Sequence, residues 1–197
     1  KNDTFKRADN SFNHKMTNQS TVFVRNDTLM KFGGYGYWSR RNFFTYYSET
    51  SREWEYYPIN YRTHFPPGVS DVNSTCSENY FYFSGGLITD PRVPLNKTKN
   101  DHVWRFNFNE KTWTDLGTAK FASGPNEQLL DLGNGRKLVK NEFNNGTPIS
   151  TFIHDYPNNE ISLIKGFNPS LSIDIGFVAN DTLYNYKNNK LVRLGLT

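Results

Sequence analysis

The chain has very little sulfur and few histidines. Its 197 residues include a single cysteine, Cys76, and two methionines. One cysteine excludes an intrachain disulfide framework and any structural zinc site that is built from several cysteines. The histidines are far apart and form neither an HxH nor an HExxH pattern; they are His14, His64, His102 and His154. The sequence therefore predicts no metal centre and no cofactor.

Long apolar runs and clustered charges are also missing. No stretch of about 18 apolar residues exists, so the sequence predicts no transmembrane segment. Lysine and arginine outnumber aspartate and glutamate by 23 to 19, which gives a formal charge of +4. These charges are scattered without a basic run of five residues, whereas a nucleic-acid interface requires clustered basic side chains. Nucleic acid is therefore not an expected partner.

Apolar residues at helical spacing are absent over any long stretch, whereas aromatic residues are abundant. The chain contains 16 phenylalanines and 12 tyrosines, together with many Asn, Thr and Ser residues. This combination favours strands and turns over helices. Short apolar runs are separated by turn residues, such as Asn26-Asp27 between two strand-like segments. An all-β fold is therefore predicted.

Two segments share the same order of parts. Residues 28–54 read TLMKFGGYGYWSRRNFFTYYSETSREW, and residues 80–113 read YFYFSGGLITDPRVPLNKTKNDHVWRFNFNEKTW. Each runs from an apolar strand through a glycine pair, a loop and an aromatic strand to a tryptophan. A glycine that closes a strand either permits a positive φ or lets a neighbouring backbone approach closely. The shared positions are Gly33, Gly34 and Trp54 in the first segment and Gly85, Gly86 and Trp113 in the second.

Two later segments carry weaker signs of the same unit. Residues 128–163 contain turn signals at 133–135 and 157–159 but lack the glycine pair and the tryptophan. Beyond Leu171, the run FVANDTLYNY is similar to FVRNDTLMKF near the N-terminus. Gly85 follows Gly33 by 52 residues and Asn180 follows Asn134 by 46, and a period of about 50 residues is typical of propeller arrays. The expected units are 21–60, 77–118, 127–166 and 171–197, after a tether or incomplete outer strand over 1–20.

The two stronger segments, about half of the chain, resemble kelch repeats. The resemblance implies a kelch-type β-propeller with about four blades, each a four-stranded antiparallel sheet. It places the glycine pairs near the central axis and the tryptophans in the core or between blades. Since kelch rings usually have more blades, a small or open ring or part of a larger one is expected. The chain is also similar to Asn-, Lys- and Tyr-rich kelch proteins of Bacteroidetes-type bacteria, which implies part of a longer periplasmic or cell-surface protein, such as a sensor.

In kelch propellers, the loop after the glycine pair and the connection between blades emerge on one face. Here the connection is a long segment, 59–79, without periodicity. Aromatic and arginine side chains supply most of the energy of many binding sites, and arginine also pairs with carboxylates. The predicted ligand-binding residues are Tyr35, Tyr37, Trp38, Arg40, Arg41, Tyr61, Arg62, His64 and Arg92. The expected ligand is a peptide, a carboxylate or a glycan. In the alternative interpretation, Tyr35 and Trp38 cover the end of their own blade and the arginines are solvated.

The sequence favours a non-enzymatic recognition or scaffold domain over an enzyme. A copper oxidase of the galactose oxidase type would need a Tyr, Tyr, His, His ligand set and a thioether-forming cysteine. Cys76 is expected to be an incidental thiol in a loop. A kelch enzyme, either an oxidase or a carbohydrate-active protein such as a sialic-acid mutarotase, and a purely structural spacer are the alternatives. A fold by itself does not assign an activity, and the sequence predicts no oligomeric state.

Overall fold

The computed structural model describes residues 9–11, 17–61, 64–89, 97–120, 129–144, 147–163, 175–179, 182–187 and 190–195. Over these ranges the chain forms antiparallel β-sheets and no helix, so the predicted all-β class is confirmed. Within the same ranges, no helix has the length and apolar character needed to cross a membrane.

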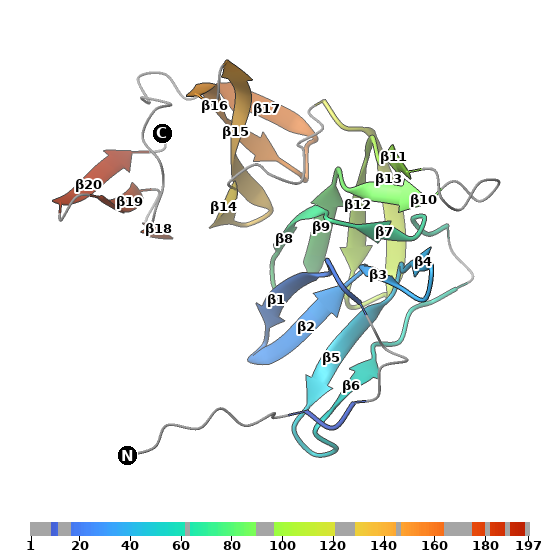
Figure 1. The fold of residues 1–197 in the computed structure, drawn as a ribbon. Coiled ribbons are helices and arrows are strands. Elements are labelled where there is room, and N and C mark those ends of the chain that lie inside the picture. Colours follow the sequence, from blue (N-terminus) through green and yellow to red (C-terminus); the bar gives the residue numbers. More distant parts are fainter. Residues whose placement is uncertain are drawn as a thin grey trace, which may run out of the picture.

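Four sheets follow one another along the chain (Figure 1). The first sheet contains β1 (Thr21–Arg25), β2 (Thr28–Phe32), β5 (Phe44–Ser48) and β6 (Glu53–Tyr56). The second contains β8 (Asn73–Cys76), β9 (Tyr80–Ser84), β12 (His102–Asn107) and β13 (Thr112–Thr118). The third contains β14 (Leu129–Gly133), β15 (Arg136–Asn144), β16 (Thr147–Asp155) and β17 (Glu160–Leu163). The fourth has three strands, β18 (Ile175–Ala179), β19 (Thr182–Lys187) and β20 (Lys190–Gly195). In each sheet, strands that are neighbours along the chain are paired.

Smaller elements are inserted after each glycine pair. A hairpin of β3 (Tyr35–Gly36) and β4 (Ser39–Arg40) follows the first pair. After the second pair, β10 (Leu87–Thr89) joins β11 (Lys97–Lys99) and β7 (Val69–Ser70) in what we call the loop sheet. Both β7 and β8 lie in segment 59–79, which the sequence predicted to be structureless. The pairing of β7 with β10 is remote in sequence, and a two-residue strand carries no periodicity that could reveal it.

Tight turns connect the main strands where the sequence predicted them. Asn26 and Asp27 have φ values of 46° and 57°, as a type I′ hairpin turn requires. The turns at 133–135 and 157–159 are also confirmed, with positive φ at Asn134 and Asn159. Residues 9–11 run beside β6, because the Asn10 N–H donates to the Arg52 carbonyl.

The glycine pairs adopt positive φ values and also allow a neighbouring backbone to approach closely. All four glycines have φ between 64° and 98°. A Cβ on Gly33 would lie 2.6 Å from the carbonyl oxygen of Val69, and one on Gly86 would lie 2.6 Å from that of Ser70. Any larger residue would therefore collide with β7, so the pairs hold the connection against the ends of β2 and β9.

An aromatic layer joins the first and second sheets. Strand alternation directs Phe32 and Phe44 of the first sheet toward the second, where both are fully buried. Trp113 of β13 enters this layer with only 4% of its surface exposed. Its ring stacks on Phe44 at 5.5 Å and 7°, and its centroid is 5.2 Å from that of Phe32. The layer forms the main hydrophobic core of the described residues.

Trp54 has the same place in its own sheet but a different environment. Trp113 on β13 pairs with Phe106, and Trp54 on β6 pairs with Tyr47. Both β13 and β6 are edge strands of their sheets. Trp54 lies on the side of the first sheet that faces away from the second. It is half-buried, with the Lys31 Nζ 3.6 Å from its ring centroid. Exposed apolar side chains share this side of the sheet: Val22, Val24 and Leu29.

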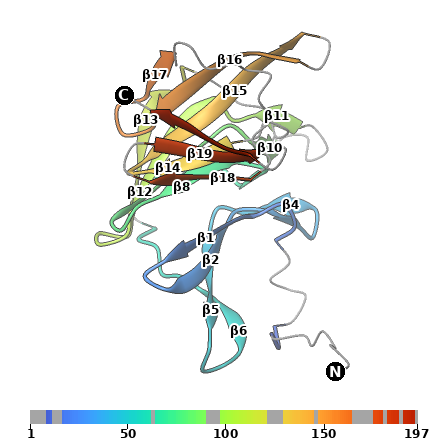
Figure 2. The ribbon, with the colours of Figure 1, turned by 90° about the vertical axis from the view of Figure 1, so that its left-hand side faces the viewer.

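The first strands of successive sheets lie side by side. β1 contacts β8, β8 contacts β14, and β14 contacts β18, an arrangement that Figure 1 and Figure 2 show from two sides. Polar side chains join them: the hydroxyl oxygens of Thr21 and Ser74 are 2.7 Å apart, and Thr75 donates to Asp131 over 2.9 Å. These bonds satisfy polar groups that would otherwise be costly to bury.

A second, more polar layer lies between the second and third sheets. Tyr156 is fully buried; its hydroxyl accepts from Ser84 and donates to the Asn73 carbonyl. His154 stacks on Tyr156 with ring centroids 4.1 Å apart and is 1% exposed. Burial lowers the pKa of His154 to about 4, although Asn159 and Asp155 favour its charged form. The imidazole is therefore neutral at pH 7.

The aromatic layer predicts unequal effects of replacing the two tryptophans. Trp113→Ala should lower the free energy of unfolding by about 3–5 kcal/mol, because it leaves a cavity between two sheets. Trp54→Ala should lower the free energy of unfolding by only about 1 kcal/mol, since the Trp54 ring is partly buried and does not lie between two sheets. Urea unfolding at pH 7 measures both. Equal losses would contradict the assignment of Trp113 to the core.

Burial of His154 predicts a loss of stability in mild acid. The folded-state pKa lies below the ordinary value of 6.5, so the stabilisation is complete above pH 6.5 and is lost as the pH falls toward 4. Between pH 7 and pH 5 this single group should remove about 2 kcal/mol from the free energy of unfolding. His154→Leu should flatten that part of the profile, because leucine takes up no proton in either state. Identical slopes in the parent and His154→Leu would refute this role.

Candidate functional site

The predicted binding residues come from two parts of the fold. The hairpin and the residue after it supply Tyr35, Tyr37, Trp38, Arg40 and Arg41. The connection between the first and second sheets supplies Tyr61 and His64. The remaining two predicted residues, Arg62 and Arg92, lie outside the described residues.

The β3–β4 hairpin carries two aromatic residues at its tip. Gly36 pairs with Ser39, so Tyr37 and Trp38 form a two-residue turn. Their φ values are 49° and 66°, in the left-handed region that a type I′ turn requires at both positions. Bulky residues in this region cost about 1 kcal/mol each. The side chains are 56% and 80% exposed, so burial does little to offset this strain.

Arg40 fastens the hairpin to the loop sheet. Its Nε donates to the Ser70 hydroxyl over 3.0 Å, and its Nη1 donates to the Thr89 hydroxyl over 2.7 Å. Ser70 in turn donates to the Asp71 carboxylate over 3.1 Å. The guanidinium carbon lies 5.4 Å from the centroid of the Tyr35 ring. One arginine thus ties together β4, β7 and β10, which come from three separate parts of the chain.

Arg41 stiffens the hairpin from within. Its Nη2 donates to the Gly36 carbonyl over 3.1 Å, and its backbone N–H donates to the Gly34 carbonyl over 2.9 Å. Both arginines therefore make specific bonds inside the chain, and Trp38 projects into solvent instead of covering the first sheet. Among the described large apolar side chains, Trp38 at the tip of the hairpin is the most exposed.

The connection carries aromatic residues along the second sheet. His64 lies on Trp104, with ring centroids 5.2 Å apart and an angle of 31° between the planes. Tyr61, which is exposed, makes an edge contact with Phe65 at 6.2 Å. Asn42 donates through Nδ2 to the Pro66 carbonyl over 3.0 Å and so joins the connection to the segment after β4.

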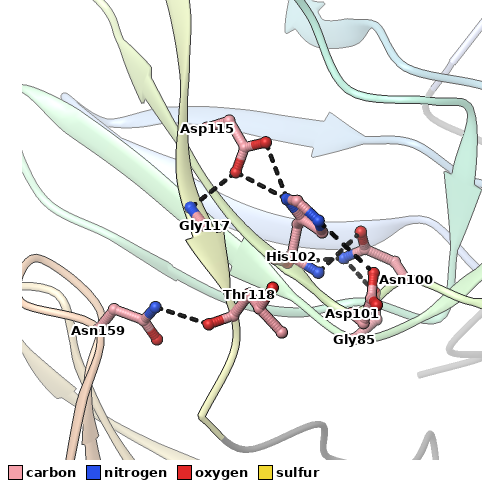
Figure 3. Close-up of polar contacts among 8 residues, drawn as sticks. All are labelled: Gly85, Asn100, Asp101, His102, Asp115, Gly117, Thr118 and Asn159. Atoms are coloured by element: carbon pink, nitrogen blue, oxygen red, sulfur yellow. Dashed lines mark hydrogen bonds and ion pairs between the residues drawn. The ribbon is translucent and has the colours of Figure 1, made fainter.

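A histidine–carboxylate pair that the sequence did not predict lies at the start of β12 (Figure 3). The Nδ1 of His102 is 2.9 and 2.8 Å from the two carboxylate oxygens of Asp115 on β13. Asp115 also accepts from the Gly117 N–H over 2.8 Å. Burial alone would raise the pKa of Asp115, but the hydrogen bonds from His102 and Gly117 and the electrostatic effect of the nearby His102 and His64 outweigh it, and the pKa lies below its ordinary value. Only the register of β12 against β13 brings the two residues together.

The surroundings of this pair do not suit a catalytic base. A general base needs one imidazole nitrogen that is free to accept a proton. The Nε2 of His102 faces a second carboxylate, that of Asp101, at 3.8 Å. A carboxylate of the protein therefore stands opposite each imidazole nitrogen. The pair joins β12 to β13 at the point where the register between these two strands shifts, between His102 and Trp104.

Cys76 is also unsuited to chemistry. It is the last residue of β8, which corrects its expected place in a loop. Its thiol is partly buried and donates to the Ser77 carbonyl over 3.3 Å. Burial raises the pKa of Cys76 to about 12, so it is a neutral thiol at pH 7 and a poor nucleophile. In the part of the chain that the structure describes, no three His, Cys, Asp or Glu residues are arranged to hold a metal ion.

No family model matches the chain, and no curated protein matches it.

Removing the Arg40 side chain tests its anchoring role. Arg40→Met should lower the free energy of unfolding by about 1–3 kcal/mol, because it removes two hydrogen bonds and leaves the hydroxyls of Ser70 and Thr89 without this donor. Arg52→Met, at an exposed turn, should change it by less than about 0.5 kcal/mol. Urea unfolding compares the two variants, and equal stability of the two proteins would show that Arg40 does not anchor the hairpin.

Proposed function

We propose that the four sheets are blades of a kelch-type β-propeller. Three observations support this proposal. The main strands of each sheet follow the chain order, the first strands of successive sheets touch one another, and the glycine pairs take equivalent conformations in the first two sheets. The burial of Trp113 between two sheets agrees with the position that kelch repeats give this residue.

The outward side of the first sheet supports a ring with more blades than these four. Trp54, Val22, Val24 and Leu29 lie on this side. In the second sheet, the equivalent side carries Trp113 and packs against the first sheet. One blade cannot bury both of its apolar sides, so a stacked neighbour is needed on each. A further sheet packed on this side would bury these residues as the first sheet buries Trp113.

We propose that the domain is a non-enzymatic recognition module, and that the tip of the β3–β4 hairpin contacts the ligand. The observation that carries this proposal is the strained, exposed pair Tyr37-Trp38. Strained backbone at an exposed position is typical of functional sites, because folding alone would favour Asn-Gly there. Tyrosine and tryptophan bury much area while losing little side-chain entropy. A peptide or a glycan is the ligand class that such a flat aromatic tip suits best.

The turn chemistry offers a variant that should lose binding while gaining stability. Tyr37→Asn combined with Trp38→Gly keeps the type I′ turn and removes both rings. This variant should raise the free energy of unfolding by about 1–2 kcal/mol, since it relieves two left-handed bulky residues. It should also lose binding to any ligand that the parent protein retains on a glycan array and an acidic-peptide array.

The matched control is Asp27→Gly in the type I′ turn between β1 and β2, which lacks aromatic residues. This variant should keep all of the binding. Retained binding by the Tyr37→Asn, Trp38→Gly protein, or the absence of any retained ligand on both arrays for the parent, would exclude the hairpin as the recognition element.

A further inference from the structure

A pocket of about 360 Å³ lies at the end of the first sheet opposite the glycine pairs. Its lining comes from the β1–β2 turn and from the strands behind it, including Arg25, Thr28, Met30, Tyr46 and Tyr57. Its size falls in the range of pockets that hold small molecules. The pocket is separate from the aromatic hairpin, so its function does not depend on the one proposed above.

Arg25 is held in place by the second sheet. Its Nε donates to the Glu78 carbonyl over 2.8 Å, and its guanidinium carbon lies 4.1 Å from the centroid of the Phe108 ring. These two contacts fix the plane of the guanidinium. The terminal N–H groups then form the fork that binds a carboxylate with two parallel hydrogen bonds. Among the described residues that line the pocket, Arg25 carries the only charge.

The walls of the pocket are mainly apolar, and their aromatic side chains pack on one another. Met30 is buried, and the rings of Tyr46 and Tyr57 meet edge to face at 6.5 Å. Tyr57 is itself packed edge-on against Phe108 at 5.8 Å. Such walls contact a flat apolar body without the loss of much side-chain freedom.

The hydroxyl of Tyr46 stays neutral. It donates to the Glu55 carboxylate over 2.8 Å, and this bond raises the pKa of Tyr46. The same carboxylate accepts from the Ser51 hydroxyl over 2.6 Å. The Glu55 carboxylate thus accepts from two hydroxyl groups, and Glu55 is not among the residues that line the pocket.

We infer that this pocket binds a small carboxylic acid with a planar apolar body. The carboxylate pairs with the Arg25 guanidinium, and the body lies against Met30, Tyr46 and Tyr57. A cation is disfavoured by Arg25, and a neutral apolar molecule leaves the guanidinium without its partner.

Benzoate and benzyl alcohol, which share the ring and differ in charge, are the probes for this site. Amide chemical shifts of the isotope-labelled chain are followed during titration with each. Benzoate should cause saturable shifts at residues of the β1–β2 turn and around Tyr57, whereas benzyl alcohol should bind at least tenfold more weakly. Arg25→Met should weaken benzoate binding at least tenfold, and the control Arg52→Met should leave it unchanged.

Arg25→Lys provides a second test in case Arg25→Met unfolds, because it keeps the positive charge and most of the contact with Phe108. It should bind benzoate severalfold more weakly than the parent, since an ammonium lacks the two-pronged geometry. Three results would overturn the inference: no saturable shifts up to roughly 20 mM benzoate, equal binding of the two probes, or unchanged binding by every folded Arg25 variant.

Discussion

The contact between the first two sheets is the interaction on which the rest of the described structure depends. Neither sheet can shield its inner side from water alone, and Phe32, Phe44 and Trp113 are buried only because the two sheets pack together. This packing also brings β1 beside β8 and sets the position from which the third sheet continues. The glycine pairs and the loop sheet have their geometry because the ends of β2 and β9 are already held in place.

The two interfaces differ in character, with a consequence for stability. The contact between the first and second sheets is almost entirely aromatic, whereas the next one places His154 and Tyr156 in a layer that also holds polar groups. The aromatic contact is insensitive to pH in the neutral range. The second contact depends on a histidine that must stay neutral, so acid acts on it first.

The two candidate binding places have different physical origins. At the hairpin, the side chains of Arg40 and Arg41 donate hydrogen bonds within the chain and anchor the loop. The aromatic pair Tyr37-Trp38, whose backbone is strained, stays exposed. At the opposite end of the first sheet, Arg25 is fixed by the second sheet and faces a pocket with aromatic walls. Arginine thus has a structural role in the hairpin and a proposed binding role at the pocket, because the hydrogen-bond acceptors around Arg40 and Arg25 differ.

The sequence alone determined the all-β class, the turn at Asn26-Asp27 and the need for glycine at 33–34 and 85–86, since alternation and backbone freedom are local properties. It also indicated a loop after the first glycine pair, and the structure shows that this loop is the hairpin that carries Tyr37 and Trp38. Tertiary structure decided which partners these elements meet. The pairing of β7 with β10, the bonds of Arg40 to Ser70 and Thr89, and the contact of His102 with Asp115 depend on the packing or register of strands. Trp54 and Trp113 occupy equivalent positions but are buried to different extents, for the same reason. The burial of each tryptophan depends on the sheet that packs against it, and the residues next to it in the sequence do not specify that sheet.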